Sequence, residues 1–177
     1  MSFNNTLLTG SRIVVTTHKE DGTSVFHSDR VLEPFSPFGP TQSSFCIFDA
    51  RSSVPVNNQE EPKDLQKTLP RVPQTGAMFC VTNMAPRHSV PMHRTLSIDY
   101  AAVLSGEIVL ELDGGEEKTL KTGDFIVQQG ANHMWHNRTD EVCKIAFVGV
   151  GSEKVKLANG EELDETVIKR PGTSVEK

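Results

Sequence analysis

The sequence is poor in cysteine and has no long hydrophobic run. Three cysteines among 177 residues are an odd number without paired spacing, which argues against a disulfide framework. Cys46, Cys80 and Cys143 each stand among apolar residues, so we predict buried, reduced thiols. The apolar runs, such as residues 145–150, are far too short to cross a bilayer, and residues 1–10 lack the basic start and apolar stretch of a signal peptide. We therefore expect a cytoplasmic protein with no membrane partner.

A basic cluster is also missing. The 18 lysines and arginines are scattered along a chain whose formal net charge is -5. Binding to a phosphate backbone requires lysine and arginine gathered on one face, so nucleic acid is not an expected partner. Small molecules are the partners that remain.

The length fits one domain, in which composition separates three zones. Residues 1–76 combine short apolar runs with a polar, proline-containing stretch, which predicts an N-terminal arm and a surface loop. Residues 77–152 hold a succession of strand-like stretches and are predicted to be the core. Residues 153–177 are charged and form a short C-terminal tail, with a short helix or edge strand expected at 161–168 and a frayed end at 171–177.

The core zone has the pattern of an all-β protein. Apolar and polar residues alternate in segments such as 108–112 and 125–127, and turn residues recur about every ten positions. This is typical of an antiparallel sandwich or barrel. The sequence Asp113-Gly114-Gly115 predicts a hairpin turn, because glycine accepts the positive φ that tight turns need.

The segment 91–100 carries the most informative pattern. If it is one strand, residues of equal parity share a face, so the polar side chains of His93, Thr95, Ser97 and Asp99 project together. A polar row that faces the interior is costly unless it binds something. The opposite face, which includes Leu96, Ile98 and Tyr100 beside Arg94, is too apolar for open solvent and predicts packing against another element or subunit.

A second segment, 123–137, supplies the other half of the expected site. A Gly-Asp turn begins a strand, a glycine turn ends it, and His133 opens the next strand with Trp135 and Asn137 on its own face. Two imidazoles and a carboxylate from neighbouring strands would then converge.

These two segments resemble the paired motifs of the cupin superfamily. The first motif is matched by His93-x-Thr95-x3-Asp99-x6-Gly106, and the second by Gly123-x6-Gly130-x2-His133-x3-Asn137. The chain departs from the pattern where Thr95 replaces a histidine, Asp99 replaces a glutamate, and the second motif lacks its proline and is one residue shorter between its glycines. The first motif's upstream glycine is absent too.

A closer likeness links residues 93–137 to small single-domain cupins of bacteria and of fungal natural-product clusters. It rests on the strings H-R-T-x-S-x-D-Y, V-L-x-G-E-I-x-L-x-L-D and G-D-x-x-V-Q-x-G-x-x-H-x-W-x-N. The resemblance implies a double-stranded β-helix, also called a jelly-roll or cupin barrel. It does not by itself imply a substrate, since one fold hosts many activities.

The resemblance also implies the site. We predict His93, Asp99 and His133 as catalytic residues, and Thr95, Ser97, Trp135 and Asn137 as substrate contacts. The same three catalytic residues are the ligand set for a divalent metal such as zinc, iron, manganese or nickel, because two imidazoles and a carboxylate suit such ions. In the metal-free alternative they act as acid and base.

The expected function is a lyase or isomerase acting by dehydration, decarboxylation or cyclisation on a small organic or polyketide-like metabolite in natural-product biosynthesis. A non-catalytic metabolite-binding cupin and an Fe(II)-dependent dioxygenase are the alternatives. The apolar outward face of the 96–100 strand predicts a homodimer, in which the N-terminal arm reaches the partner.

Overall fold

The structure is a computed structural model that describes residues 10–61 and 63–166. Within these residues it contains strands and turns but no helix, and therefore no helix able to cross a membrane. The strands described there are β1 (Ser11–His18), β2 (Ser24–Leu32), β3 (Ser44–Arg51), β4 (Ala77–Met84), β5 (Ser89–His93), β6 (Ser97–Ser105), β7 (Glu107–Leu112), β8 (Glu117–Lys121), β9 (Phe125–Gln129), β10 (His133–His136), β11 (Cys143–Gly151), β12 (Val155–Lys156) and β13 (Glu162–Leu163).

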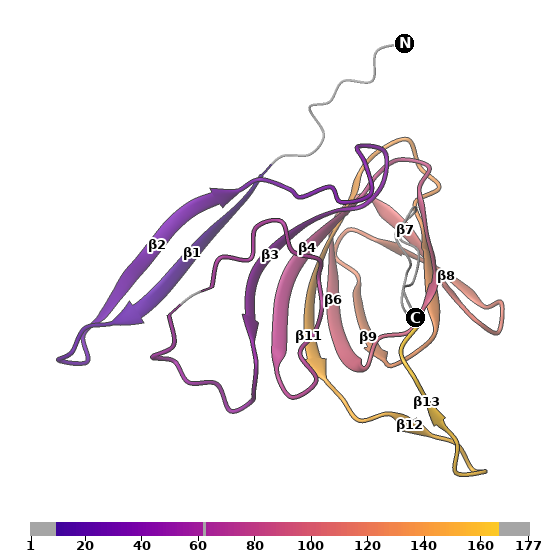
Figure 1. Ribbon diagram of the computed structural model, residues 1–177. Helices are drawn as coiled ribbons and strands as arrows, with labels where there is room; N and C mark the ends of the chain where they lie inside the picture. Colours follow the sequence, from indigo (N-terminus) through magenta and orange to yellow (C-terminus); the bar gives the residue numbers. More distant parts are fainter. Residues whose placement is uncertain (1–9, 62, 167–177) are drawn as a thin grey trace, which may run out of the picture.

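Two antiparallel sheets form the barrel (Figure 1). One has the order β5-β10-β7-β8 and the other β3-β4-β11-β6-β9, so the chain repeatedly crosses between them. Buried side chains from both sheets meet in one core, whose members are Met84, Ala101, Val103, Ile108, Trp135, Cys143 and Ile145. The predicted all-β jelly-roll fold is confirmed.

Local sequence explains the hairpin between β7 and β8. Gly115 has a φ of +83°, and the Leu112 amide donates to the Glu116 carbonyl at 2.9 Å, which closes the turn predicted at residues 113–115. The predicted state of the cysteines is confirmed too: Cys46, Cys80 and Cys143 are buried and free.

The structure corrects the prediction of a single strand through residues 93–99. Strand β5 ends at His93 and belongs to the four-stranded sheet, while β6 begins at Ser97 in the five-stranded sheet. The three residues between them carry the chain from one sheet to the other. Strand alternation therefore does not place His93 and Asp99 on one face; they belong to two different sheets that enclose one interior.

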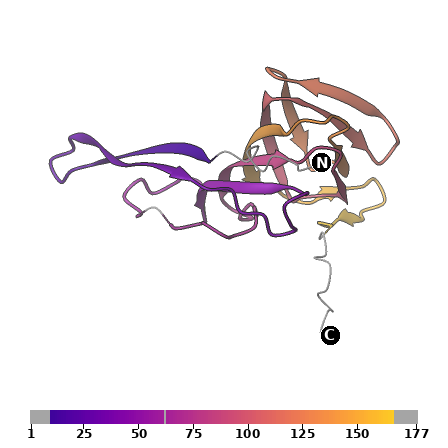
Figure 2. The ribbon, with the colours of Figure 1, turned by 90° about the horizontal axis from the view of Figure 1, so that it is seen from above.

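The segments before β4 comprise a projecting hairpin, an edge strand and a loop. Strands β1 and β2 form a hairpin that projects from it (Figures 1 and 2). Strand β3 pairs with β4 at the edge of the five-stranded sheet. In the loop that follows, Leu65 and Val72 pack against a small cluster of Ile47, Met78 and Cys80.

The C-terminal tail contains a small hairpin of β12 and β13. A short helix or edge strand was expected at 161–168, and the structure has the strand β13 at its start. Residues 167–177, including the predicted frayed end, lie outside the described residues.

Candidate active site

Two histidines face each other across neighbouring strands of the four-stranded sheet. His93 on β5 and His133 on β10 are register partners, and their ring centroids lie 4.1 Å apart. Nδ1 of His93 is 2.8 Å from the Pro91 carbonyl oxygen, and Nδ1 of His133 is 2.9 Å from the Ala131 carbonyl oxygen. A carbonyl oxygen only accepts, so each Nδ1 carries the proton in the neutral ring and each Nε2 is the unprotonated nitrogen.

The predicted carboxylate lies on the facing sheet, at the start of β6. Asp99 accepts hydrogen bonds from the hydroxyls of Ser97, at 3.0 Å, and Thr95, at 3.3 Å. The two hydroxyl oxygens are themselves 3.0 Å apart. Burial raises the pKa of Asp99, while the hydrogen bonds from Ser97 and Thr95 act in the opposite direction. The two hydroxyl residues predicted beside this carboxylate, Thr95 and Ser97, are therefore brought together with it.

Gln128 on β9 joins the two halves of the site. Its side-chain Nε2 lies 3.2 Å from Nε2 of His133 and 3.5 Å from Oδ2 of Asp99. The residue is 6% exposed, and its Oε1 is buried with no hydrogen-bond partner among the described residues. A ligand that donates a hydrogen bond would satisfy this oxygen.

Our sequence analysis missed Gln128, although a signal was present. In β9 the exposed residues Phe125, Val127 and Gln129 alternate with Ile126 and the buried Gln128. A polar side chain in the inward phase of a strand, opposite Asp99 in register, is the pattern that identifies it.

A glycine makes room for Asp99 on the adjacent strand. Gly149 of β11 is the register partner of Asp99, and a Cβ at this position would lie 2.7 Å from Asp99 Oδ1 and 2.4 Å from Val72 Cγ2. Any larger residue at position 149 would displace the carboxylate or the loop residue. The absence of a side chain thus allows the loop after β3 to cover the barrel interior beside Asp99.

Both histidines are electrically neutral near pH 7. Burial, and then the proximity of His93, lowers the pKa of His133 to about 4, against the Ala131 carbonyl, which acts to raise it. Burial also lowers the pKa of His93, partly offset by the Pro91 carbonyl. The His93 Nε2 lone pair is consequently available to accept a proton.

The lowered pKa of His133 predicts a loss of stability in acid. Between its ordinary pKa of 6.5 and about 4, the unfolded state binds a proton at this ring that the folded state does not. The contribution of His133 to the free energy of unfolding should therefore decrease as the pH falls, by at most about 1.4 kcal/mol per pH unit. We expect the stability difference between the wild type and His133→Gln to shrink from pH 7 to pH 5 in urea unfolding. NMR titration of the His133 ring should show its midpoint well below 6, and a midpoint near 6.5 would contradict the assignment.

Trp135 packs against His133 on the side of the main core. It is 2% exposed, meets the His133 ring edge-on at 5.9 Å between centroids, and contacts Phe147 in the same manner. Because Trp135 belongs to the main core, its ring packs against His133 and does not present an exposed face to a substrate.

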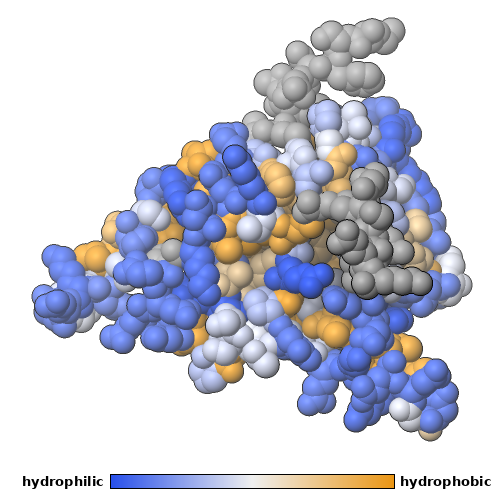
Figure 3. Space-filling view, in the orientation of Figure 1, coloured by the Kyte–Doolittle hydropathy of each residue, from blue (hydrophilic) through white to orange (hydrophobic). Residues whose placement is uncertain are grey.

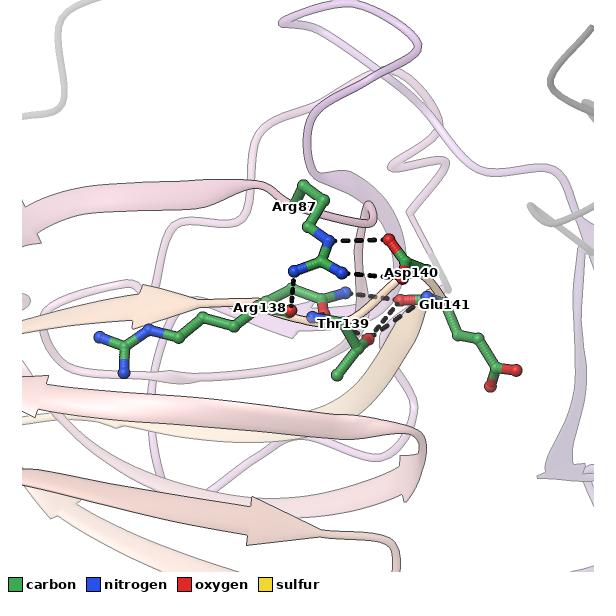
Figure 4. A network of polar contacts seen from close by, with 6 residues as sticks. Arg87, Arg138, Thr139, Asp140 and Glu141 are labelled. Carbon is green, nitrogen blue, oxygen red and sulfur yellow. Dashed lines mark hydrogen bonds and ion pairs between the residues drawn. The ribbon is translucent and has the colours of Figure 1, made fainter. Parts of the chain in front are cut away.

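Asn137 does not join the site. It follows the end of β10 away from His133, and its amide donates to the carbonyls of Met84, at 3.0 Å, and Glu141, at 2.7 Å. Its Oδ1 accepts from the amide and hydroxyl of Thr139. Figure 4 shows the surrounding network, in which Arg87 forms an ion pair with Asp140. This side chain organises a loop, so it is not retained as a substrate contact.

The predicted metal ligands do not form a ready-made site. The ligand atoms of His93, Asp99 and His133 do not all lie within 4.8 Å of one another, and the Gln128 amide stands between the carboxylate and His133. Among the described residues, the group with metal-compatible spacing is Glu111, Glu117 and His136. In that group His136 Nε2 is 2.8 Å from Glu111, and Glu117 is paired with Arg138.

Comparison with known proteins identifies the family of the chain. Residues 80–149 match the family described as "Cupin domain". The chain is 30% identical over 162 residues to the Oryzines biosynthesis cluster protein J of Aspergillus oryzae, covering 86% of this chain and 89% of that protein. The chain is a cupin. This confirms the resemblance inferred from residues 93–137.

Two further proteins are similar to this cupin. It is 31% identical over 134 residues to a cupin-domain-containing oxidoreductase of Aspergillus ruber, covering 73% of this chain and 66% of that protein. Its fold is similar to the cupin domain of Schizosaccharomyces pombe Cnp3, with a TM-score of 0.50 and 12% identity, over 80% of this chain and 88% of that one.

Proposed function

We propose that this cupin is an enzyme of natural-product metabolism that transfers protons on a small organic or polyketide-like metabolite. The reaction class is that of a lyase or isomerase: dehydration, decarboxylation or cyclisation. The observation that carries the proposal is the uncharged His93, whose Nε2 lone pair is free while Nδ1 is held by the Pro91 carbonyl. The relative encoded in a biosynthesis cluster supports the metabolic setting.

Each residue of the site has a separate task in this proposal. His93 Nε2 takes a proton from the substrate, because the Pro91 carbonyl holds its ring in one tautomer. His133, with its pKa near 4, stays neutral and holds Gln128 in place through its own Nε2. Asp99 is the second titratable group of the proposed site, and burial raises its pKa, which favours a role in proton exchange with the substrate.

The remaining polar groups fix the substrate. The hydroxyls of Thr95 and Ser97 bond to Asp99 and can exchange these bonds for bonds to a ligand. The unpaired Oε1 of Gln128 accepts a hydrogen bond from a substrate hydroxyl or amide. These contacts favour a substrate that has both a donor group and an acidic carbon-bound hydrogen.

Hydrogen exchange tests this proposal directly. The purified protein is incubated in D₂O with carbonyl-containing metabolites of its gene neighbourhood, with and without EDTA, and deuterium incorporation is followed by mass spectrometry. We expect catalysed incorporation at carbon that EDTA does not change. Tight binding without exchange or turnover would identify a binding protein instead.

A redox reaction is the second candidate, because the Aspergillus ruber relative is described as an oxidoreductase. Elemental analysis of the purified protein separates the two candidates when combined with the EDTA arm of the exchange experiment. Turnover that disappears with EDTA and returns with one added divalent ion would favour metal-assisted chemistry over proton transfer by His93.

A further inference from the structure

The side-chain amide of Gln128 lies between two groups that are typical metal ligands. Its Nε2 is 3.2 Å from Nε2 of His133, with a longer contact of 3.5 Å to Oδ2 of Asp99. An amide NH₂ group has two donors, so one N–H is available for each of these atoms. A metal binds an imidazole through its unprotonated nitrogen and a carboxylate through its oxygen. Gln128 therefore contacts the same two atoms that an ion held between His133 and Asp99 would need.

The orientation of this amide is set by its neighbours. Nδ1 of His133 donates to the Ala131 carbonyl oxygen at 2.9 Å, so Nε2 of the same ring is an acceptor. Oδ2 of Asp99 is an acceptor as well, since the Thr95 hydroxyl donates to it. An amide turned by 180° would direct its own oxygen at both acceptors, which is repulsive. The NH₂ group of Gln128 therefore faces the imidazole and the carboxylate.

The strands hold the carboxylate against this amide. Asp99 and Gln128 are register partners on β6 and β9, so their side chains leave adjacent strands side by side. On the other side of Asp99, a Cβ at Gly149 of β11 would lie 2.7 Å from Oδ1, so the carboxylate is close to the β11 backbone. Its oxygens also accept from Ser97 and Thr95. Asp99 is thus confined between Gln128 and β11.

The distances fit hydrogen bonds and not metal coordination. Bonds from zinc to an imidazole nitrogen or a carboxylate oxygen are about 2.0–2.2 Å long. An ion at the position of Gln128 Nε2 would be more than about 1 Å too far from each ligand atom. Thr95, which stands at a histidine position of the superfamily motif, donates its hydroxyl to Asp99. With the amide in place, neither His133 Nε2 nor Asp99 Oδ2 is available to an ion.

These contacts lie away from solvent. Gln128, Asp99 and His133 are all buried. On the face shown in Figure 3, hydrophobic residues are visible between the hydrophilic ones toward the middle of the barrel. Because water competes little for buried hydrogen bonds, the contacts of the amide are stronger here than they would be on the surface. A divalent ion that entered would have to displace both of them.

We propose that the Gln128 amide takes the place of a metal ion in this barrel, so that the wild type does not take up a divalent ion between His133 and Asp99. Replacement of Gln128 by a residue that donates no hydrogen bond frees both atoms for a metal. Gln128→Glu achieves this with almost no change in shape and adds a third ligand. Metal binding is measured without a substrate, so this property is independent of the reaction proposed above.

Titration with Co²⁺ tests the proposal on the full chain. The wild type, Gln128→Glu and Gln128→Ala are stripped with EDTA, dialysed and titrated, and the visible absorption of the ion reports on its ligands. We expect Gln128→Glu to bind one Co²⁺ at least about 100-fold more tightly than the wild type, because outer-shell partners alone change metal affinity by about 10–100-fold. Zn²⁺ should raise the melting temperature of Gln128→Glu and leave that of the wild type unchanged. Gln128→Ala frees the same two atoms without burying a charge, and it should also bind more tightly than the wild type.

The matched control is Gln129→Glu. Gln129 is the next residue of β9 and is exposed, so this substitution adds the same charge outside the barrel. Its Co²⁺ affinity should equal that of the wild type. Binding at the surface group around His136 is removed by carrying His136→Ala in every protein. Addition of His133→Ala to Gln128→Glu should abolish the new site.

Three results would overturn the proposal. A wild type that binds one Co²⁺ as tightly as Gln128→Glu means that the amide does not exclude the ion. Folded Gln128→Glu and Gln128→Ala proteins that bind no more tightly than the wild type have the same meaning. A gain in affinity that survives His133→Ala places the ion elsewhere. None of these results depends on hydrogen exchange at a substrate, so the proposed proton transfer and the role of Gln128 stand or fall separately.

Discussion

Replacement of His93 by alanine is expected to lower kcat by about 10²–10⁴-fold, the usual contribution of a general base. The ring lies beside His133, with Nδ1 held by the Pro91 carbonyl, and no other described imidazole has a free Nε2 within this group. The effect should fall on kcat more than on KM, because the loss concerns proton transfer and leaves the hydroxyls around Asp99 in place. Steady-state kinetics on the substrate found by the exchange experiment measures it.

The control for His93 is His88→Ala, which removes a histidine just before the same strand. Its side chain makes no hydrogen bond in the described structure, so activity should stay within about two-fold, as for a residue outside the chemistry. Imidazole added to the His93→Ala variant should restore part of the rate. An unchanged kcat in that variant, with substrate binding intact, would exclude His93 as the base.

Replacement of Asn137 by alanine is expected to lower the free energy of unfolding by about 3 kcal/mol, because two carbonyls and the Thr139 donors lose buried partners. The residue is 2% exposed and its amide bonds to the carbonyls of Met84 and Glu141, which ties the loop after β10 to the end of β4. Urea unfolding followed by tryptophan fluorescence reports on the same core, since Trp135 is the only tryptophan of the chain.

Asn159→Ala provides the comparison for Asn137. Asn159 makes an exposed turn with Glu161, so its loss should cost only about 0.5 kcal/mol. The motif position of Asn137 led us to expect a substrate contact, and the two roles differ in this measurement. A variant with wild-type stability and a raised KM would restore the substrate-contact role.

Much of the site was predictable because it depends on local spacing. The turn at Gly130 and the position of His133 three residues later place that ring at the beginning of a strand, and the hairpin at residues 113–115 brings its neighbour β7 alongside β8. The alternation in β6 likewise placed Ser97 and Asp99 on one face. These features follow from the two-residue period of a strand and from glycine's freedom to adopt a positive φ.

Other features depended on contacts between distant segments. The chain changes sheets between His93 and Ser97, so strand parity does not relate His93 to Asp99. The two halves of the site are connected through His133 and Gln128. Gln128 entered the site because β9 pairs with β6 opposite Asp99. Asn137 lies outside the site because its side-chain amide donates a hydrogen bond to the backbone of β4.

By itself, the sequence determined the all-β class, the turns, the buried thiols and the pair of histidines, since each depends on side-chain alternation or on backbone preferences within a few residues. Only the tertiary structure decided how the imidazoles, the carboxylate and Gln128 are arranged, and that the arm stands free of its own barrel. These features depend on contacts between segments that are far apart in the chain. Side-chain packing in the tertiary structure, rather than local backbone preference, determines which of these contacts form.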